Sequence, residues 1–166
     1  MPSIYVGLRV ISAVKEEKYL GVIVCGNRKD DKAIQKETRA LYYRGNMLYR
    51  NFKGCSDDIK IQLFSSHCFS FYCSSLWSIY KRSTIKAIEV AYNNIFRLLF
   101  HIPRRVSISA HYVAYGLPCF KNVRRKLIYS IYSRVLSSEN ELVSTIVNSC
   151  FFLSSSIFNE WVNVLF

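Results

Sequence analysis

The chain has 166 residues, of which 51% are hydrophobic and 15% are aromatic. Disordered chains are poor in aromatic residues, so this composition excludes a wholly disordered chain and predicts one packed domain, with room for a small appendage. The formal net charge is +12, from 23 Lys and Arg against 11 Asp and Glu. This excess favours an anionic partner, namely nucleic acid, an acidic protein or an acidic membrane surface.

Two short runs rich in Val, Ile and Tyr open the chain at residues 3–10 and 18–24. They are predicted to form an antiparallel hairpin or to lie as neighbouring strands, and Gly21 suggests a bulge or a close backbone approach. Because two strands alone are marginally stable in water, we expect this pair to complete a sheet whose other strands lie outside the chain. The first strand also begins almost at the N-terminus, and both points predict a fragment of a longer protein.

A turn at residues 26–29 precedes a long predicted helix, which Asp30 or Asp31 would cap. Its apolar residues recur at alternating steps of four and three and so define one packed face. These residues are Ile34, Thr38, Leu41, Gly45, Leu48 and Phe52. Gly45 within this stripe would allow a neighbouring helix to approach closely, at some cost in helix stability. Gly54 is expected to end the helix.

The next predicted helix, residues 59–72, is apolar on several sides and is therefore expected at the centre of a bundle, with Ser56, Asp57 or Asp58 as its cap. A third helix follows, capped by Ser83 or Thr84 and stopped by Pro103. Its apolar seam consists of Ile85, Ile88, Tyr92, Ile95 and Leu99. A cationic cluster marks its end, at Arg97, His101, Arg104 and Arg105.

After a break at residues 116–118, residues 120–136 predict another helix and residues 137–140 a linker. The tail that follows is apolar but interrupted by polar residues, so a packed helix pair is favoured over a membrane anchor. The fold class is therefore mainly α: a short N-terminal β-hairpin followed by a bundle of four to six helices. The expected division is a hairpin at 1–28, a helical domain at 29–137 and an apolar helical tail at 138–166.

Residues that could support catalysis are few. The acid pairs Asp30–Asp31 and Asp57–Asp58 could hold metal ions for phosphoryl transfer, but each directly precedes a predicted helix, where capping explains it. A glycine-rich phosphate loop and a GxSxG motif are both missing from the sequence. A Cys–His nucleophile pair is left open, although nothing in the sequence favours it.

The six cysteines form no CxxC pair and are expected to be reduced, mostly buried thiols of an intracellular protein, in the nucleus or the cytoplasm. They are Cys25, Cys55, Cys68, Cys73, Cys119 and Cys150. The alternative is a zinc site, although its spacing matches no established zinc-ligand pattern. That site would use Cys55, His67, Cys68 and Cys73.

Binding is the function that the remaining pattern favours, because basic residues alternate with tyrosines along the chain. Lys and Arg neutralise phosphates and Tyr stacks on bases, so the basic clusters predict contacts with a nucleic-acid backbone. The candidate residues are Lys81, Arg82, Arg97, Arg104, Arg105, Arg124, Arg125 and Lys126. For any single tyrosine the simpler interpretation is a boundary residue of a helical bundle.

Several stretches, taken in order, resemble one protein family. They read KYLGV at 18–22, KIQLFSSHCFSFYCSSLW at 60–77, AYNNIFRL at 91–98, SISAHY at 107–112 and SRVLSSEN at 133–140. Their order and spacing resemble the region after the catalytic palm in reverse transcriptases of non-LTR (LINE-like) retrotransposons. The resemblance spans about residues 4–140 and implies that the hairpin ends the palm and the helices from Asp31 form the thumb. In that family the thumb grips the RNA template and the growing DNA strand of an RNA-directed DNA polymerase.

The fingers, the palm with its aromatic-any-Asp-Asp motif, and any endonuclease are missing from this sequence. The resemblance therefore implies a thumb fragment that does not polymerise alone and binds no cofactor of its own, whereas the parent would use Mg²⁺ at the palm. The expected partners are RNA, DNA or an RNA–DNA hybrid, together with the missing palm and fingers, and not a membrane. The alternative is a non-functional remnant or a helical protein–protein interaction module that self-associates.

Overall fold

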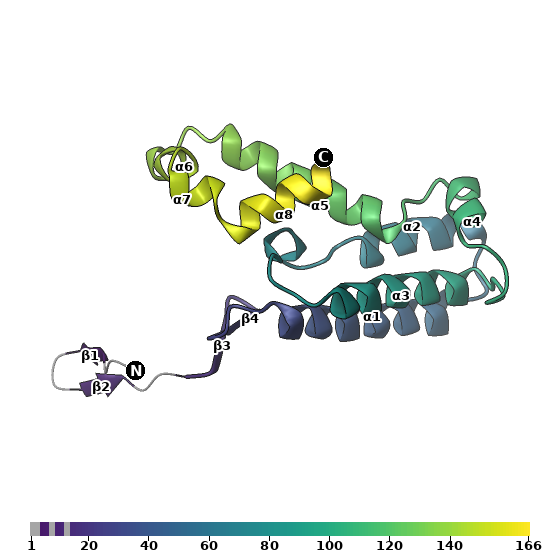
Figure 1. Ribbon diagram of the computed structural model, residues 1–166. Coiled ribbons are helices and arrows are strands. Elements are labelled where there is room, and N and C mark those ends of the chain that lie inside the picture. The colour runs from purple at the N-terminus through teal and green to yellow at the C-terminus, as the bar shows by residue number, and fades with distance from the viewer. Residues whose placement is uncertain (1–3, 7–8, 12–13) are drawn as a thin grey trace.

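The computed structural model describes residues 4–6, 9–11 and 14–166, and the chain is mainly helical, as predicted (Figure 1). The strands are β1 Ile4–Val6, β2 Arg9–Ile11, β3 Glu16–Tyr19 and β4 Val22–Cys25. The helices are α1 Asp31–Phe52, α2 Asp57–Cys68, the 3₁₀ helix η1 Ser74–Leu76, α3 Arg82–Leu99, α4 Ser109–Ala114, α5 Phe120–Leu136, α6 Glu141–Val147, α7 Cys150–Leu153 and α8 Ser156–Leu165.

The predicted N-terminal hairpin is present, but the two predicted runs do not pair with each other. β1 pairs with β2, and β3 pairs with β4, both antiparallel. The second run folds back because Leu20 and Gly21, with φ of 46° and 83°, form a two-residue turn between Tyr19 and Val22. Positive φ at both central residues matches the strand twist and closes a tight hairpin. Gly21 therefore lies in a turn rather than in a bulge.

The β3–β4 hairpin is held against the helices by side chains of α1 and of the segment between α2 and η1. The Lys32 ammonium of α1 pairs with the Glu16 carboxylate, and the Lys36 ammonium donates to the Gly21 carbonyl oxygen. The Tyr72 hydroxyl donates to the Leu20 carbonyl oxygen. These contacts fix the hairpin at the start of α1.

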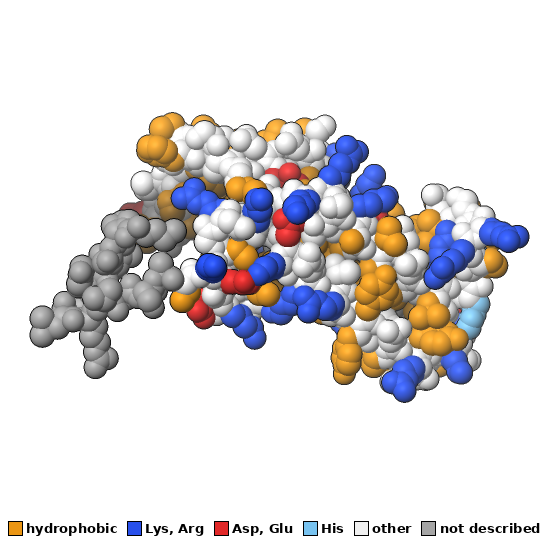
Figure 2. Space-filling view, turned by 60° about the horizontal axis from the view of Figure 1, so that its bottom comes forward, with side chains coloured by type: hydrophobic (Ala, Val, Ile, Leu, Met, Phe, Trp, Pro, Cys, Tyr) orange, Lys and Arg blue, Asp and Glu red, His pale blue; other side chains and the backbone are white. Residues whose placement is uncertain are grey.

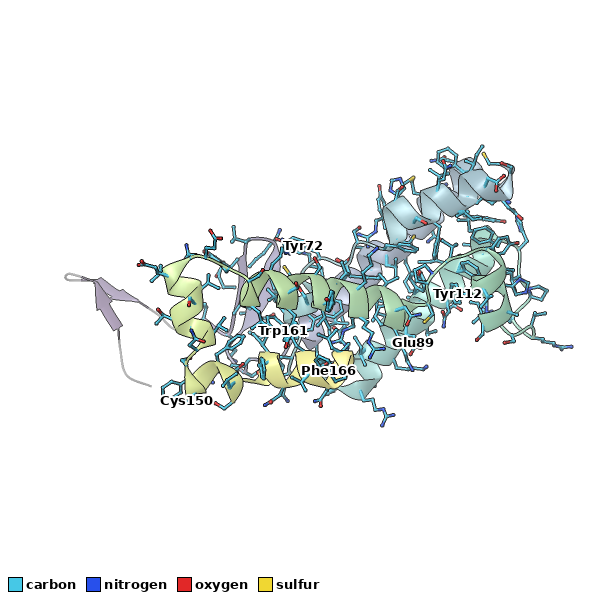
Figure 3. All side chains as sticks on the ribbon, turned by 90° about the horizontal axis from the view of Figure 1, so that it is seen from above. Tyr72, Glu89, Tyr112, Cys150, Trp161 and Phe166 are labelled. Carbon is cyan, nitrogen blue, oxygen red and sulfur yellow. The ribbon has the colours of Figure 1, made fainter. Side chains whose placement is uncertain are left out.

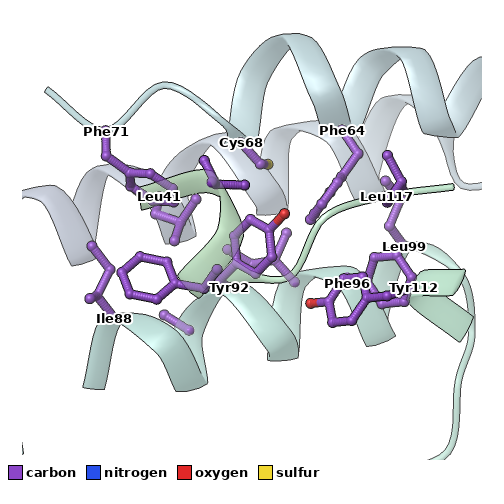
Figure 4. Packing of buried hydrophobic residues seen from close by; sticks show 14 of the residues in the cluster. Leu41, Phe64, Cys68, Phe71, Ile88, Tyr92, Phe96, Leu99, Tyr112 and Leu117 are labelled. Atoms are coloured by element: carbon purple, nitrogen blue, oxygen red, sulfur yellow. The ribbon is translucent and has the colours of Figure 1, made fainter. Parts of the chain in front are cut away.

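The core lies between α1, α2 and α3, and both predicted apolar faces are confirmed. On α1 the buried residues include Ile34, Leu41, Gly45 and Leu48, and on α3 they include Ile88, Tyr92, Ile95 and Leu99. The central α2 contributes Phe64, whose ring contacts those of Tyr92 and Phe96 on α3 (Figure 4). Burial of these aromatic and aliphatic side chains is the main stabilising contribution to the bundle.

Gly45 lies at a close contact between α1 and α3. A Cβ added at this glycine would lie 2.5 Å from Ile95 Cγ2, so the predicted close contact is confirmed. We expect Gly45→Ala to lower the free energy of unfolding by about 1–3 kcal/mol, because an extra methyl group overpacks the interface. Urea denaturation measures this change. Gly54→Ala is the control: its Cβ would meet nothing within 4 Å, and an equal loss there would contradict the packing argument.

Asp30 is the N-cap residue of α1, as predicted, but its side chain makes no capping hydrogen bond to this helix. The Asp30 carboxylate instead accepts hydrogen bonds from the N–H groups of Ser78 and Ile79, at 2.8 and 2.9 Å. The Asp31 carboxylate accepts one from the Lys81 N–H, at 3.0 Å, and one from the Thr84 hydroxyl. These two donors hold the pKa of Asp31 below its ordinary value. The two carboxylates therefore hold the segment that leads into α3, and the N-cap residue of α3 is Lys81 rather than Ser83 or Thr84.

The end of α3 also differs from the prediction, because the helix stops before Pro103 is reached. His101 adopts a left-handed φ of 53°, and the Ile102 N–H donates to the Arg97 carbonyl oxygen at 2.9 Å. This bond pattern is the Schellman ending of a helix. It turns the chain sharply, so Arg104 and Arg105 follow in a loop beside the helix end.

The tail forms three short helices that fold back along α5, where a packed helix pair was expected (Figure 1). Trp161 of α8 is buried, and its indole N–H donates to the Ser75 carbonyl oxygen at 2.6 Å. Figure 3 shows Trp161 and Phe166 along α8, which lies beside α5. Among the described residues, no helix combines the length and the apolar character that crossing a membrane requires. The division at residues 28 and 137 stays a prediction.

Candidate nucleic-acid interface

The predicted binding residues gather at the two ends of α3. With 18 residues, this helix is about 27 Å long at about 1.5 Å per residue. Lys81 and Arg82 lie at its start, and Arg97 lies in its last turn, next to the loop that carries Arg104 and Arg105. The structure therefore makes two separate basic groups, where the sequence alone indicated one set.

The first group surrounds a cavity of about 960 Å³ between the starts of α3 and α5 and the end of α8. Arg82 and Arg125 line it, and so do Lys86 and Lys121, which the sequence analysis missed. Lys86 is partly neutralised by Glu89, with 2.9 Å between ammonium and carboxylate. Both helices begin at this cavity, so their dipoles add to its positive potential.

Lys126 lies outside that cavity, on a neighbouring hollow that it shares with Arg125 and the exposed ring of Tyr129. Arg125 also donates to the Leu165 carbonyl oxygen of α8. The exposed face of α5 therefore extends the first group, with an aromatic ring beside its cations.

The second group lines a hollow of about 540 Å³ between α1, α3 and the loop that follows α3. We call this depression the α1–α3 hollow. Arg97 and Arg104 line it, and the Arg97 Nη1 donates to the Pro103 carbonyl oxygen at 2.7 Å. That bond fixes the loop, while Arg104 and Arg105 are exposed. Two guanidinium groups at a pinned loop suit contact with phosphate oxygens.

Arg124 differs from the other predicted residues, because its guanidinium already has partners within the protein. Its side chain is buried, with the residue 7% exposed, and its Nη2 lies 2.8 Å from a Glu160 carboxylate oxygen. Its Nη1 donates to the Tyr80 hydroxyl at 3.1 Å, and the guanidinium lies over the Tyr80 ring, 5.3 Å from its centroid. A buried and neutralised guanidinium is not available to a phosphate backbone, so Arg124 joins α5 to α8 instead.

Acidic residues are distributed unevenly along the chain, a feature on which none of the predictions above was based. Between Glu89 and Glu139 the chain has no Asp or Glu. Its Lys and Arg in that interval are Arg97, Arg104, Arg105, Lys121, Arg124, Arg125, Lys126 and Arg134. Figure 2 shows Lys and Arg side chains spread over one face, with hydrophobic side chains between them. This run without acidic residues would have indicated the second basic group and the part of the first group that lies on α5.

The tyrosines divide between the two interpretations that the sequence left open. Tyr92 and Tyr112 are core residues, and burial raises the pKa of both hydroxyls. Tyr80 is half-buried, and burial together with its hydrogen bond to Glu160 raises its pKa. Tyr129 is 61% exposed beside the cations of α5, so its ring is accessible to a ligand, whereas Tyr43, at 76% exposed, lines none of these hollows.

The described residues give little support for a nucleophilic cysteine or for a metal site. Cys68 is buried, and burial raises the pKa of its thiol to about 12, which makes it a poor nucleophile beside His67. All six cysteines are free thiols. Among residues 4–6, 9–11 and 14–166, no group of three or more His, Cys, Asp and Glu is arranged to hold a metal ion.

Comparison with known proteins adds no assignment, since the chain matches no protein-family model, curated protein or solved structure.

Proposed function

We propose that this chain is a nucleic-acid-binding, thumb-like module that contacts the phosphate backbone of RNA, DNA or an RNA–DNA hybrid. The observation that carries the proposal is the exposure of basic side chains at both ends of α3, among them Arg82, Arg104 and Arg105. Each phosphate that a Lys or Arg neutralises releases counterions, which favours binding at low salt. The loop with Arg104 and Arg105 is the strongest part of this surface, because both side chains are exposed and the Arg97 contact pins the loop.

The resemblance to non-LTR retrotransposon reverse transcriptases supports the same function. Under this proposal the β3–β4 hairpin is the end of a palm, and α1 to α5 form the thumb. The chain would bind template and primer but supply no catalytic carboxylates, so it is not itself an enzyme, and any Mg²⁺ would belong to the parent's palm. Its free cysteines suit a reducing, intracellular compartment, either the nucleus or the cytoplasm.

The double variant Arg104→Ala with Arg105→Ala tests the proposal. We expect weaker binding to all sequences alike, and a slope of log K against log salt that is smaller by about 2, about 1 for each lost phosphate contact. Fluorescence anisotropy with a labelled RNA–DNA hybrid at several salt concentrations measures both quantities. The control is Lys15→Ala with Lys18→Ala, which removes the same charge from exposed positions on or beside β3.

Three results would count against backbone recognition. The first is absence of binding at low salt, and the second is binding that does not respond to salt. The third is an equal loss of affinity in the control double variant, because that would reflect net charge rather than the loop.

One observation favours a second candidate, a helical protein–protein interaction module. Large apolar side chains of the tail are exposed: Leu142 at 75%, Phe151 at 82% and Phe166 at 87%. Exposed apolar patches mark association surfaces in many soluble proteins. Size-exclusion chromatography separates the candidates, since concentration-dependent oligomers without affinity for nucleic acid would favour this one.

A further inference from the structure

The α1–α3 hollow contains groups that backbone recognition does not require. Besides Arg97 and Arg104 it is lined by Tyr42 and Asn46 of α1 and by Asn94 and Leu98 of α3. A phosphate backbone needs only the cations. A ring, two amides and an apolar side chain instead match the parts of a nucleobase.

The close helix contact explains why the two amides share one hollow. Gly45 packs directly against Ile95, and Asn46 and Asn94 are the neighbours of these two residues in the sequence. Because the backbones approach so closely at Gly45, side chains from both helices line a single depression. Its floor includes the buried side chains of Ile95 and Ile102.

The two amides and the tyrosine ring of the hollow are free to bind a ligand. Within the described part of the chain, the amides of Asn46 and Asn94 make no hydrogen bond, and the ring of Tyr42 pairs with no other aromatic ring. Tyr42 is 39% exposed and Leu98 37% exposed, so both are accessible at the mouth. An amide offers a donor and an acceptor side by side, which is the pattern that base edges accept.

We propose that the α1–α3 hollow holds one unpaired nucleotide of a bound strand. The base stacks on Tyr42 and hydrogen-bonds through its edge to Asn46 and Asn94, while Arg104 and Arg97 contact its phosphate. The hollow of about 540 Å³ lies within the roughly 300–1,000 Å³ range of small-molecule sites. This inference rests on the proposed function and adds to it a site that recognises a base.

The strand must be unpaired at this position. In a duplex the faces of each base are covered by its stacked neighbours, and its pairing edge is occupied. Only a splayed base can offer a face to Tyr42 and an edge to the amides. The site therefore distinguishes a single strand, or a single-stranded end of a hybrid, from a fully paired duplex.

The experiment compares the binding of two probes by fluorescence anisotropy at low salt. One probe is a single-stranded DNA of about 12 nucleotides, and the other is a blunt RNA–DNA hybrid of the same sequence. The length of the single strand lies within the site sizes of about 4–16 nucleotides known for single-strand binders. Tyr42→Ala should weaken single-strand binding by about 5- to 100-fold, the range expected for one lost stacking contact, and leave hybrid binding unchanged. Tyr42→Phe keeps the ring and should bind both probes like the original chain. The matched control is Tyr43→Ala, which removes the neighbouring exposed ring outside the hollow and should also leave both affinities unchanged.

Other outcomes separate this inference from the proposed function. If Tyr42→Ala weakens neither probe, or weakens both equally, the nucleotide site is overturned, while salt-dependent binding of the hybrid would still support backbone recognition. If neither probe binds at low salt, both proposals are overturned. Circular dichroism of Tyr42→Ala establishes that the variant is folded, and the double variant Asn46→Ala with Asn94→Ala repeats the test through the base edge.

Discussion

Replacing Phe64 by alanine is expected to lower the free energy of unfolding by about 3–5 kcal/mol, the loss typical of a large aromatic side chain removed from a core. Phe64 is fully buried on α2. Its ring centroid lies 5.2 Å from that of Tyr92 and 5.5 Å from that of Phe96, both on α3, and 6.4 Å from that of Phe100 just beyond α3. The substitution therefore removes the side chain that joins the two helices and leaves a cavity between them.

Urea denaturation followed by circular dichroism measures the change in unfolding free energy. Phe151→Ala is the control, because that phenylalanine is 82% exposed and its loss should cost less than about 0.5 kcal/mol. Similar losses for the two variants would contradict a core centred on Phe64. Since a domain is stabilised by only about 5–15 kcal/mol in total, this loss is a large share of the stability of the protein.

Replacing Glu160 by alanine is expected to cost about 3 kcal/mol, at the lower end of the range for breaking a buried ion pair. The Arg124 and Glu160 side chains are only 9% and 17% exposed, and Glu160 also accepts a hydrogen bond from the Tyr80 hydroxyl. Without the carboxylate, a buried guanidinium keeps its charge but loses its partner. Its Nε already lacks a hydrogen-bond partner among the described residues, so little else compensates.

Glu89→Ala is a matched control for this prediction. Its carboxylate is similarly shielded, at 20% exposed, but its partner Lys86 is 64% exposed, so the loss should stay below about 1 kcal/mol. A double variant, Arg124→Leu with Glu160→Leu, should recover much of the stability, because two apolar side chains replace the pair. Equal losses for Glu89→Ala and Glu160→Ala, or no recovery in the double variant, would contradict a buried pair.

The helical framework could be predicted from the sequence because it depends on a local pattern. Apolar residues spaced three and four apart indicated the buried faces of α1 and α3, including the close contact at Gly45. The β3–β4 turn could not be predicted in this way, because Leu20 adopts a positive φ, which residues other than glycine rarely adopt. The roles of Asp30 and Asp31 were also missed, since their hydrogen-bond donors lie about fifty residues further along the chain.

The candidate site was predicted only in part, because charge in a sequence does not reveal burial. The exposure of Arg104 and Arg105 agrees with the role expected of them. The burial of Arg124 was not predicted, although a signal was present: Phe120, Arg124 and Ile128 are four residues apart and therefore share one helix face. What the sequence did not contain was the position of α8, which brings Glu160 to that face. The α1–α3 hollow likewise depends on how two helices pack.

The pairing of Arg124 with Glu160 also bears on the order in which the protein is completed during synthesis. Arg124 is made 36 residues before its counter-charge, and Ser75 is made 86 residues before Trp161, which donates to its carbonyl oxygen. The three-helix core of α1, α2 and α3 can form as soon as α3 has been made, because its partners are already present. The face of α5 that packs against α8, by contrast, stays uncovered until nearly the whole described chain has been synthesised. During that time the positive charge of Arg124 lies unpaired on an apolar face. A nascent chain of this protein therefore completes its three-helix core well before that face of α5 is covered.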